Sequence, residues 1–526
     1  MTVRKVSLLA AIAGVVSAGV VLAVAELVSV FIGAAASPLF AVGSLVIDLA
    51  PGGVKEIMVS LFGTGDKAAL LTLMGILIVV ISGAAGILEL RRSPWGVIVF
   101  GVGGLIALIA VVTRAGAPAI NGVSTIVGAV AGVVVLHISE QRLARWRAAT
   151  ERSTSTGERP SPNAAESSLQ LERRGFLTMA VVAGAAAVVV GTGARLINAT
   201  STKVAAIRTK IVLPKPAVAT APMPANASLD IPGVTPYVTS NADFYRIDTA
   251  LQVPSIDPEK WTLKVTGMVE NEIELTFAEL LKKPLEEHLA TLACVSNDVG
   301  GDLIGNALWL GYPIRELLKQ AVPKAGADMV LSRSVDGFTA GTPLSVLQDP
   351  GTEALLAVGM NGETLPLEHG FPVRMVVPGL YGYVSATKWL VEMKVSKFSE
   401  DQGYWIPRGW SAKGPIKLAS RIDTPLNNSS VSAGTVAVAG VAWEQHVGVA
   451  SVEVQVDSGP WVEATLADSV SADTWRQWVY RWPASKGSHK IRVRATDVNG
   501  TTQGQAYAPP APNGAEGWHE ITVNIS

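Results

Sequence analysis

The first 200 residues of the chain contain long stretches without a single charged side chain. A helix of about 20 apolar residues crosses the hydrocarbon core of a bilayer, because it satisfies its own backbone hydrogen bonds. The sequence therefore predicts a membrane domain over residues 1–138 with four spans, at Val6–Ala25, Ala68–Leu88, Trp95–Val112 and Ala119–Leu136.

A fifth apolar run, residues 176–195, follows a polar linker over residues 139–175. With five spans, the arginine and lysine clusters fall on one side, which the positive-inside rule assigns to the cytoplasm. Everything after the fifth span then lies outside the cytoplasmic membrane of a bacterium. Leu27–Ile47 is also free of charge, and we interpret it as a helix end plus an interfacial segment. A sixth span there would reverse the topology.

The linker ends in the sequence LERRGFL, at Leu171–Leu177. Paired arginines, then Phe-Leu and a moderately apolar run resemble a twin-arginine signal, which directs the export of proteins already folded around a cofactor. An arginine pair at the cytoplasmic edge of a span explains the same residues by topology alone. Export of a folded domain agrees with the single cysteine, since one cysteine cannot form an intramolecular disulfide.

The rest of the chain divides into three parts with different patterns. Residues 196–240 are rich in Pro, Ala and Thr, which predicts an extended tether. Short β-like runs alternate with helix-like runs over residues 241–415, which predicts an α+β domain. Strand-like alternation over residues 416–526 predicts an immunoglobulin-like sandwich that lacks the usual cysteine pair. The formal net charge of −1 argues against nucleic acid as a partner.

The single cysteine, Cys294, lies in the stretch ATLACVSND. A free cysteine commonly behaves as a small buried hydrophobe. Here it follows an apolar, strand-like run and precedes a loop rich in Ser, Asn and Gly, where a strand end presents a side chain to a cleft. Both a packing role and a functional role remain open on this basis.

Four further segments accompany this cysteine: SNADFYRIDTAL at 240–251, WLGYPIRELL at 309–318, LPLEHGFPVRMVVPGLYGY at 365–383 and TKWL at 387–390. Together they resemble the sulfite oxidase family of molybdenum-cofactor enzymes. The resemblance covers residues 241–397, and the sandwich is similar to the family's second, often dimer-forming domain, which implies a homodimer. It does not extend to the membrane region.

The resemblance implies a molybdenum-molybdopterin cofactor, with Cys294 as the protein ligand of the metal. A thiolate is a soft ligand that suits molybdenum, and the phosphate of the pterin needs cations and hydrogen-bond donors. At the matching positions, the cofactor-binding candidates are Asn241, Tyr245, Arg246, Ser334, His369, Arg374, Thr387 and Lys388.

The substrate side departs from the family. In sulfite oxidase, a Gly-Asn-Arg-Arg run follows the cysteine, and an Ala-Arg-Trp tripeptide supplies an arginine that helps to hold sulfite. This chain has CVSND and Ala-Leu-Trp instead, so a cation is missing and the case for sulfite is weaker. Asn297, Asn306 and Trp309 are the candidates that line the substrate side beside Cys294, although such asparagines also serve as turn residues.

These observations predict a multi-domain fold of N-terminal transmembrane α-helices, an α+β sulfite-oxidase-like molybdopterin domain and an all-β immunoglobulin-like sandwich. The expected function is oxygen-atom transfer on a small substrate that is sulfite-like, a sulfoxide or an N-oxyanion. His137 is the single histidine of the four spans, so the chain alone cannot build a bis-histidine haem. The membrane domain is therefore interpreted as an anchor in the lipid bilayer that docks a separate cytochrome or quinone-linked protein. A cofactor-free scaffold that binds a partner through the sandwich is the alternative.

Overall fold

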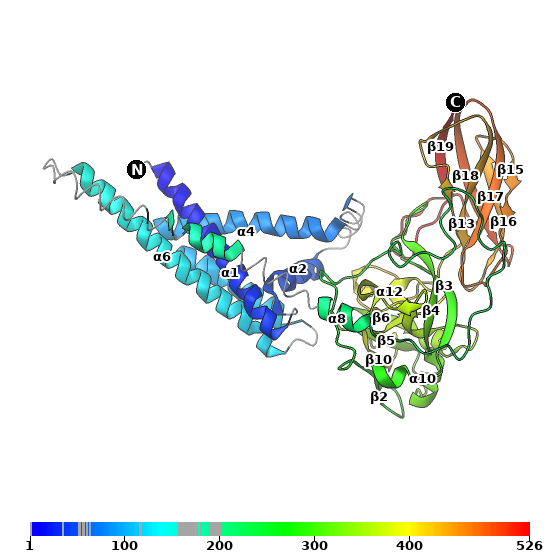
Figure 1. Cartoon of the computed structure of the whole chain (residues 1–526), viewed down its shortest axis with the longest axis horizontal. Helices are drawn as coiled ribbons and strands as arrows, with labels where there is room; N and C mark the ends of the chain where they lie inside the picture. The colour runs from blue at the N-terminus through cyan, green and yellow to red at the C-terminus, as the bar shows by residue number, and fades with distance from the viewer. Residues whose placement is uncertain are drawn as a thin grey trace. The chain divides into compact units, whose positions relative to one another are not determined.

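The computed structural model describes residues 3–33, 36–50, 54, 58, 61–62, 65–114, 118–155, 174, 177–178, 180–188 and 201–526. The chain forms two compact units. The first comprises Met1–Lys203 with Ala250–Gln252, and the second comprises Val204–Thr249 with Val253–Ser526. In Figure 1, helices α1 to α6 of the first unit are coloured blue to cyan, and the strands of the second unit are coloured green to red.

Four helices of the first unit are long and apolar enough to cross a membrane, over Arg4–Ile32, Lys67–Arg91, Trp95–Val112 and Ala119–Ala148. They contain the four predicted spans, which are thereby confirmed in length and composition. The helices of this unit are α1 (Val3–Ile32), α2 (Pro38–Leu49), α4 (Asp66–Arg91), α5 (Trp95–Val112), η3 (Ala119–Asn121) and α6 (Gly122–Ser155).

The charge-free stretch Leu27–Ile47 contains a helix end and a separate short helix, as predicted. Helix α1 ends at Ile32, and α2 begins at Pro38, a residue suited to the first turn of a helix. With 12 residues, α2 is about 18 Å long, well short of the roughly 30 Å hydrocarbon core. The twin-arginine-like motif and much of the linker lie outside the described residues, and residues 180–188 of the fifth apolar run are helical.

Helices α1 and α4 contact each other through small residues that are spaced four apart on each helix. These are Ala10 and Gly14 on α1, and Ser82 and Gly86 on α4. A Cβ atom at Gly14 would overlap the carbonyl oxygen of Ser82, and one at Gly86 would overlap that of Ala10. Such close backbone contact is typical of helices that associate within a membrane.

The α+β part of the second unit contains two sheets, with strand orders β2-β1-β10-β5-β6 and β3-β4-β7-β8, and β9 pairs with β7. Strands β1 and β10 run parallel, and the other pairs in these sheets are antiparallel. The strands are β1 (Thr262–Gly267), β2 (Ile273–Thr276), β3 (Glu286–Ala293), β4 (Ile304–Pro313), β5 (Met329–Ser334), β6 (Thr339–Pro343), β7 (Leu355–Met360), β8 (Glu363–Thr364), β9 (Arg374–Val376) and β10 (Leu390–Ser396).

Short helices accompany these strands, and α9 and α10 lie in the helix-like runs of the sequence. They are α8 (Ser201–Arg208), α9 (Phe277–Leu280), α10 (Ile314–Ala321), α11 (Leu344–Gln348), η4 (Leu367–His369), α12 (Gly382–Ser385) and η5 (Ile406–Arg408). Helix α9 begins with a capping box between Thr276 and Glu279. Helix α10 is amphipathic, because its buried residues recur at helical spacing along one face.

The prediction of an extended tether over residues 196–240 is wrong in the described part. Helix α8 lies within it, and the segment after α8 packs against the α+β domain. The backbone N–H of Ala217 donates to the carbonyl of Leu285 (2.7 Å), and Tyr237 is buried in the core. Single backbone hydrogen bonds and single buried side chains fix this segment to the domain. Such contacts leave no helical or strand period in the sequence, so periodicity does not reveal them.

The C-terminal part is a β-sandwich, as predicted, with sheets ordered β11-β13-β17-β16 and β12-β19-β18-β14-β15. Alternate residues of its strands, such as Val452 and Val454, are buried between the two sheets. Its strands are β11 (Ala419–Thr424), β12 (Ser430–Val431), β13 (Gly434–Trp443), β14 (Val449–Val456), β15 (Trp461–Glu463), β16 (Thr465–Leu466), β17 (Arg476–Ala484), β18 (Gly487–Asp497) and β19 (His519–Ile525).

The sandwich and the α+β domain share a hydrophobic core, to which the sandwich contributes Trp443 and Trp475. Thr291 in β3 connects the two domains by hydrogen bonds. Its Oγ1 accepts from the backbone N–H of Trp475 (2.8 Å), and its own N–H donates to the carbonyl of Asp473 (2.9 Å). The sandwich therefore helps to fix the position of β3, the strand that precedes Cys294.

Candidate active site

A partly open cavity of about 120 Å³ lies at the end of β3. Its lining includes six residues singled out in the sequence, which come from separate segments of the chain: Tyr245, Cys294, Ser334, His369, Arg374 and Lys388. The fold thus brings half of the candidate site residues predicted from the sequence to the lining of one cavity.

Cys294 follows the last residue of β3, and its thiol lines the cavity instead of lying within a core cluster. Its backbone N–H donates to the carbonyl of Leu303 (2.9 Å), and the N–H of Ser296 approaches Sγ at 3.4 Å. Burial raises the pKa of the thiol, although the contact with Ser296 opposes this shift. A thiol of this kind stays protonated at neutral pH until a metal ion replaces the proton.

Arg374 supplies a buried positive charge. Its Nη1 donates to the carbonyl of His369 (3.2 Å), and its guanidinium lies 5.0 Å from the ring centre of Trp309. Within the described residues, no carboxylate forms an ion pair with it, and burial lowers its pKa to about 10. Because a buried charge without a counterion is costly, an anion bound in the cavity would compensate it.

Lys388 supplies a second buried cation, and this one has an acidic partner. Its Nζ donates to Asp248 Oδ2 (2.8 Å) and to the carbonyl of Glu368 (3.1 Å). Burial lowers the pKa of Lys388 to about 8, although Asp248 opposes the shift. Asp248 also accepts from Nε of Arg246 (3.0 Å), so Arg246 acts on the site through this carboxylate and does not line the cavity.

His369 is neutral near pH 7. Its Nε2 lies 2.9 Å from the carbonyl oxygen of Asn241, an acceptor, so this nitrogen carries the proton. Burial lowers the pKa of His369 to about 4, the contact with Asn241 opposes the shift, and Arg374 and Lys388 add to the lowering. Asn241 therefore positions His369 and does not itself line the cavity.

Two residues beside these cations, Gly370 and Trp389, have unusual backbone conformations. Gly370 has φ +111°, and a Cβ atom there would lie 3.0 Å from Cβ of Arg374 and 3.1 Å from Cβ of Lys388. Trp389, with φ +52°, is a non-glycine residue in the left-handed region, next to a β-bulge in the pairing of β10 with β5. Such backbone strain and bulges often occur at functional sites.

Of the remaining cofactor candidates, Tyr245 and Ser334 line the cavity, and Thr387 supports the segment beside it. Ser334, at the end of β5, lines the cavity, and its Oγ lies 3.4 Å from the N–H of Asp336. Thr387 is fully buried, and its hydroxyl pairs with that of Ser332 at 2.7 Å. Thr387 thus supports the segment that carries Lys388 without facing the cavity.

The three substrate-side candidates do not line this cavity, and we correct their assignment. Asn297 Oδ1 accepts from the N–H of Leu303 (2.8 Å), which is the turn role. Asn306 is fully buried and donates to the carbonyl of Tyr237 (2.9 Å). Trp309, also fully buried, donates to the carbonyl of Ala290 (3.2 Å) and lies under Arg374. With their polar groups paired in the core or the loop, these residues have structural roles.

Aromatic side chains form a part of the cavity wall that sequence analysis missed, namely Phe244, Phe338, Tyr383, Trp389, Trp405 and Trp410. The ring centres of Tyr383 and Trp410 are 5.9 Å apart, and those of Trp405 and Trp410 are 6.1 Å apart. The two tryptophans of YWIPRGW were a usable signal, but only the fold places them in the lining of the same cavity as Cys294. Asp248 was also missed, although it lies within the quoted stretch SNADFYRIDTAL.

The buried neutral His369 should make the stability of the domain depend on pH. Its pKa is about 4 in the folded state and near 6.5 when unfolded, so between these values the unfolded chain binds more protons. The free energy of unfolding should therefore fall as pH drops from about 6.5 to 4, by up to about 1.4 kcal/mol per pH unit. Urea unfolding of cofactor-free protein at pH 7 and pH 5 measures this, and His369→Gln should remove this part of the dependence. An unchanged pH dependence in the variant would contradict it.

The comparisons with known proteins agree with this geometry. Residues 250–405 match the family described as "Oxidoreductase molybdopterin binding domain", and residues 419–493 match "Bacterial Ig domain". Residues 250–405 are therefore a molybdopterin-binding oxidoreductase domain, and the chain is similar to the sulfite oxidases. Mitochondrial sulfite oxidase of Rattus norvegicus is 29% identical over 340 residues, which cover 55% of this chain and 62% of the relative.

The chain is also similar to a plant nitrate reductase and to a bacterial sulfane dehydrogenase. Inducible nitrate reductase (NADH) 1 of Glycine max is 30% identical over 202 residues, 34% of this chain and 22% of that protein. The sulfane dehydrogenase SoxCD from Paracoccus pantotrophus has 20% identity and a TM-score of 0.48, with coverage of 56% and 84%. The chain spans 62% of the length of the rat and mouse sulfite oxidases that it matches.

The residues present fit the molybdenum-molybdopterin cofactor of this family. A soft sulfur ligand and a buried guanidinium that forms no ion pair with a carboxylate of the described residues line one cavity. Cys294 would hold the metal, while Arg374, Lys388 and His369 would face the polar and phosphate groups of the pterin. Tyr245 has its pKa raised, chiefly by burial, so its hydroxyl remains a hydrogen-bond donor.

Proposed function

We propose that this protein is a membrane-anchored, molybdopterin-dependent oxidoreductase that transfers an oxygen atom to or from a small substrate. The observation that carries the proposal is the joint placement of the Cys294 thiol and the uncompensated Arg374 charge in one cavity. A cofactor-free scaffold would have no reason to bury such a cation, because the desolvation cost would remain without an anion.

Each lining residue has a distinct task in this proposal. When bound, the cofactor supplies two-electron redox chemistry and the transfer of an oxygen atom. Cys294 provides a thiolate for the metal, and the pair Lys388–Asp248 fixes the ammonium in position at the cavity wall. His369, held neutral by burial and by Asn241, presents a fixed tautomer. The aromatic residues exclude water from the reacting centre.

The lining of the cavity also favours one class of substrate. In this proposal the cations that line the cavity face the anionic groups of the cofactor, and Tyr383, Trp405 and Trp410 supply an aromatic part of the lining. An aromatic surface suits a neutral or weakly charged group better than a dianion. We therefore place a sulfoxide ahead of sulfite and of an N-oxyanion among the substrates.

The cellular setting is part of the same proposal. The four long apolar helices support anchoring in the cytoplasmic membrane of a bacterium, and the arginine distribution supports an extracytoplasmic catalytic domain exported by a twin-arginine route. A cytochrome or a quinone-linked protein would exchange electrons with it, because His137 is the one histidine of the four spans and a bis-histidine haem needs two. The sandwich would mediate a homodimer.

The test is expression of the full chain in a molybdenum-competent bacterium, followed by metal analysis and dye-coupled assays. We expect about one molybdenum per chain, and turnover of a sulfoxide with a reduced dye that exceeds the oxidation of sulfite. Material without molybdenum from a host that loads a control molybdoenzyme would reject the enzyme and favour the scaffold. Molybdenum with faster sulfite oxidation would reject only the substrate assignment.

A further inference from the structure

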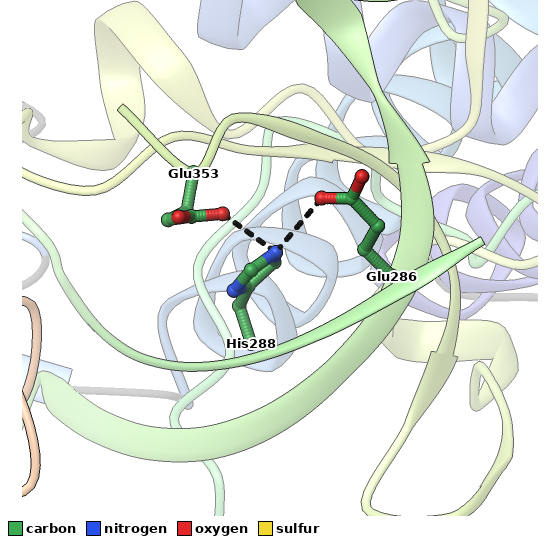
Figure 2. A group of neighbouring side chains, drawn as sticks. All are labelled: Glu286, His288 and Glu353. Atoms are coloured by element: carbon green, nitrogen blue, oxygen red, sulfur yellow. Dashed lines mark hydrogen bonds and ion pairs between the residues drawn. The ribbon is translucent and has the colours of Figure 1, made fainter. Parts of the chain in front are cut away.

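A second group of possible metal ligands lies outside the candidate active site. Glu286 and His288 are two residues apart on β3, so their side chains share one face of the strand, and Glu353 comes from the segment between α11 and β7. The ligand atoms of the three residues lie within 4.8 Å of one another. Figure 2 shows both carboxylates directed at the same edge of the imidazole ring. Glu286 and His288 precede Cys294 by most of the length of β3, and none of the three residues lines its cavity.

The contacts within this cluster are incomplete. Nε2 of His288 lies 2.6 Å from Oε2 of Glu353 and 3.3 Å from Oε2 of Glu286. A neutral imidazole nitrogen carries at most one proton, so it can donate to only one of these oxygens. Glu353 Oε2 is inaccessible to solvent and makes no hydrogen bond of acceptable geometry, in spite of the short distance.

The charges are also unbalanced. Arg315 Nη2 pairs with Glu286 at 3.2 Å and compensates one carboxylate. Glu353 has no lysine or arginine partner among the described residues, and its contact is with His288. An imidazole nitrogen and two carboxylate oxygens that converge in this way can each supply one ligand atom to a cation.

We propose that Glu286, His288 and Glu353 bind a divalent transition-metal ion of the Zn²⁺ class. Imidazole and carboxylate ligands suit such borderline ions, and three protein ligands leave a position for water. Metal–ligand bonds of about 2.1 Å in tetrahedral geometry separate ligand atoms by roughly 3.4 Å. The contact between His288 and Glu286 already has this spacing, and the Glu353 side chain, about a third exposed as a whole, would move back from His288 to admit the ion.

The ion would join two parts of the domain that are distant in sequence. It would fix the start of β3 to the segment before β7, next to the point where the N–H of Glu287 donates to the carbonyl of Val218 (2.9 Å). Its effect would be on stability and would be separate from turnover at the molybdenum cofactor. This inference does not depend on the proposed function.

The test is a Zn²⁺ titration of chelator-treated, full-length protein in detergent, with Co²⁺ absorption as a spectroscopic readout. We expect one Zn²⁺ per chain at this site and a rise in the melting temperature on its addition. His288→Gln and Glu353→Gln should each weaken binding roughly tenfold or more. Glu287→Gln is the matched control, because its side chain lies on the other face of β3 and its binding should equal that of the unmodified protein.

The proposal is overturned if the unmodified protein binds no Zn²⁺, or if both ligand variants bind it as tightly as the control does. Either result leaves an ion-pair cluster only. If His288→Gln fails to fold, Glu353→Gln provides the same comparison. The side chain of Glu353 is partly exposed, so its replacement should disturb folding less. A visible Co²⁺ spectrum that is lost in Glu353→Gln and retained in Glu287→Gln supports the proposal.

Discussion

Replacement of Cys294 by serine is expected to reduce turnover at least about a hundredfold, the upper range for removal of the outer-shell support of a metal ligand. A hydroxyl is a harder ligand than a thiolate and stays protonated at neutral pH, so it cannot replace the sulfur at molybdenum. The loss should appear in the maximal rate of the dye-coupled assay with the preferred substrate. X-ray absorption at the molybdenum edge should show one sulfur ligand fewer.

The molybdenum content of this variant separates the ligand role from a folding defect. Arg374, Lys388 and His369 remain in place to hold the pterin, so the metal content should fall much less than the activity does. Circular dichroism should be unchanged, because serine is smaller than cysteine and the side chain lines a cavity. A variant that keeps full turnover would show that the sulfur is not a ligand.

Replacement of Asp248 by asparagine should lower the free energy of unfolding by about 3 kcal/mol, because it leaves Lys388 buried without its partner. Both side chains are nearly inaccessible, at 3% exposure for Asp248 and 10% for Lys388. This loss of unfolding free energy is at the low end of the range for a broken buried ion pair. The reason is that Lys388, with a pKa of about 8, can release its proton when its partner is removed. Urea unfolding of cofactor-free protein at pH 7 measures the difference.

The double variant Asp248→Asn, Lys388→Met is the informative comparison. The depressed pKa of Lys388 means that the desolvation cost exceeds the attraction to Asp248, so removal of both charges should recover most of the lost stability. Asp243→Asn is the matched control, because this aspartate is exposed in the same segment and should change stability by less than about 1 kcal/mol. A double variant as unstable as the sum of the single variants would contradict this account.

Much of the architecture could be predicted from local patterns in the sequence. Charge-free runs predicted the membrane helices, because the cost of burying a charge in lipid is a property of the segment itself. Alternation predicted strands such as β14 and β18, and the amphipathic run 313–321 predicted α10. The segment 196–240 was not predictable in this way, since Ala217 and Tyr237 are fixed by partners elsewhere in the chain.

For the site, the sequence by itself determined which residue types are present: one thiol, a histidine and two cations in a family-like motif. Tertiary structure alone decided which of them face a common space. In the folded chain, Asn306 and Trp309 are buried in the core, and Asp248 pairs with Lys388. Aromatic side chains line the same cavity as Cys294. The physical reason is that burial and charge compensation depend on contacts between segments far apart in the chain, and no local pattern encodes these contacts.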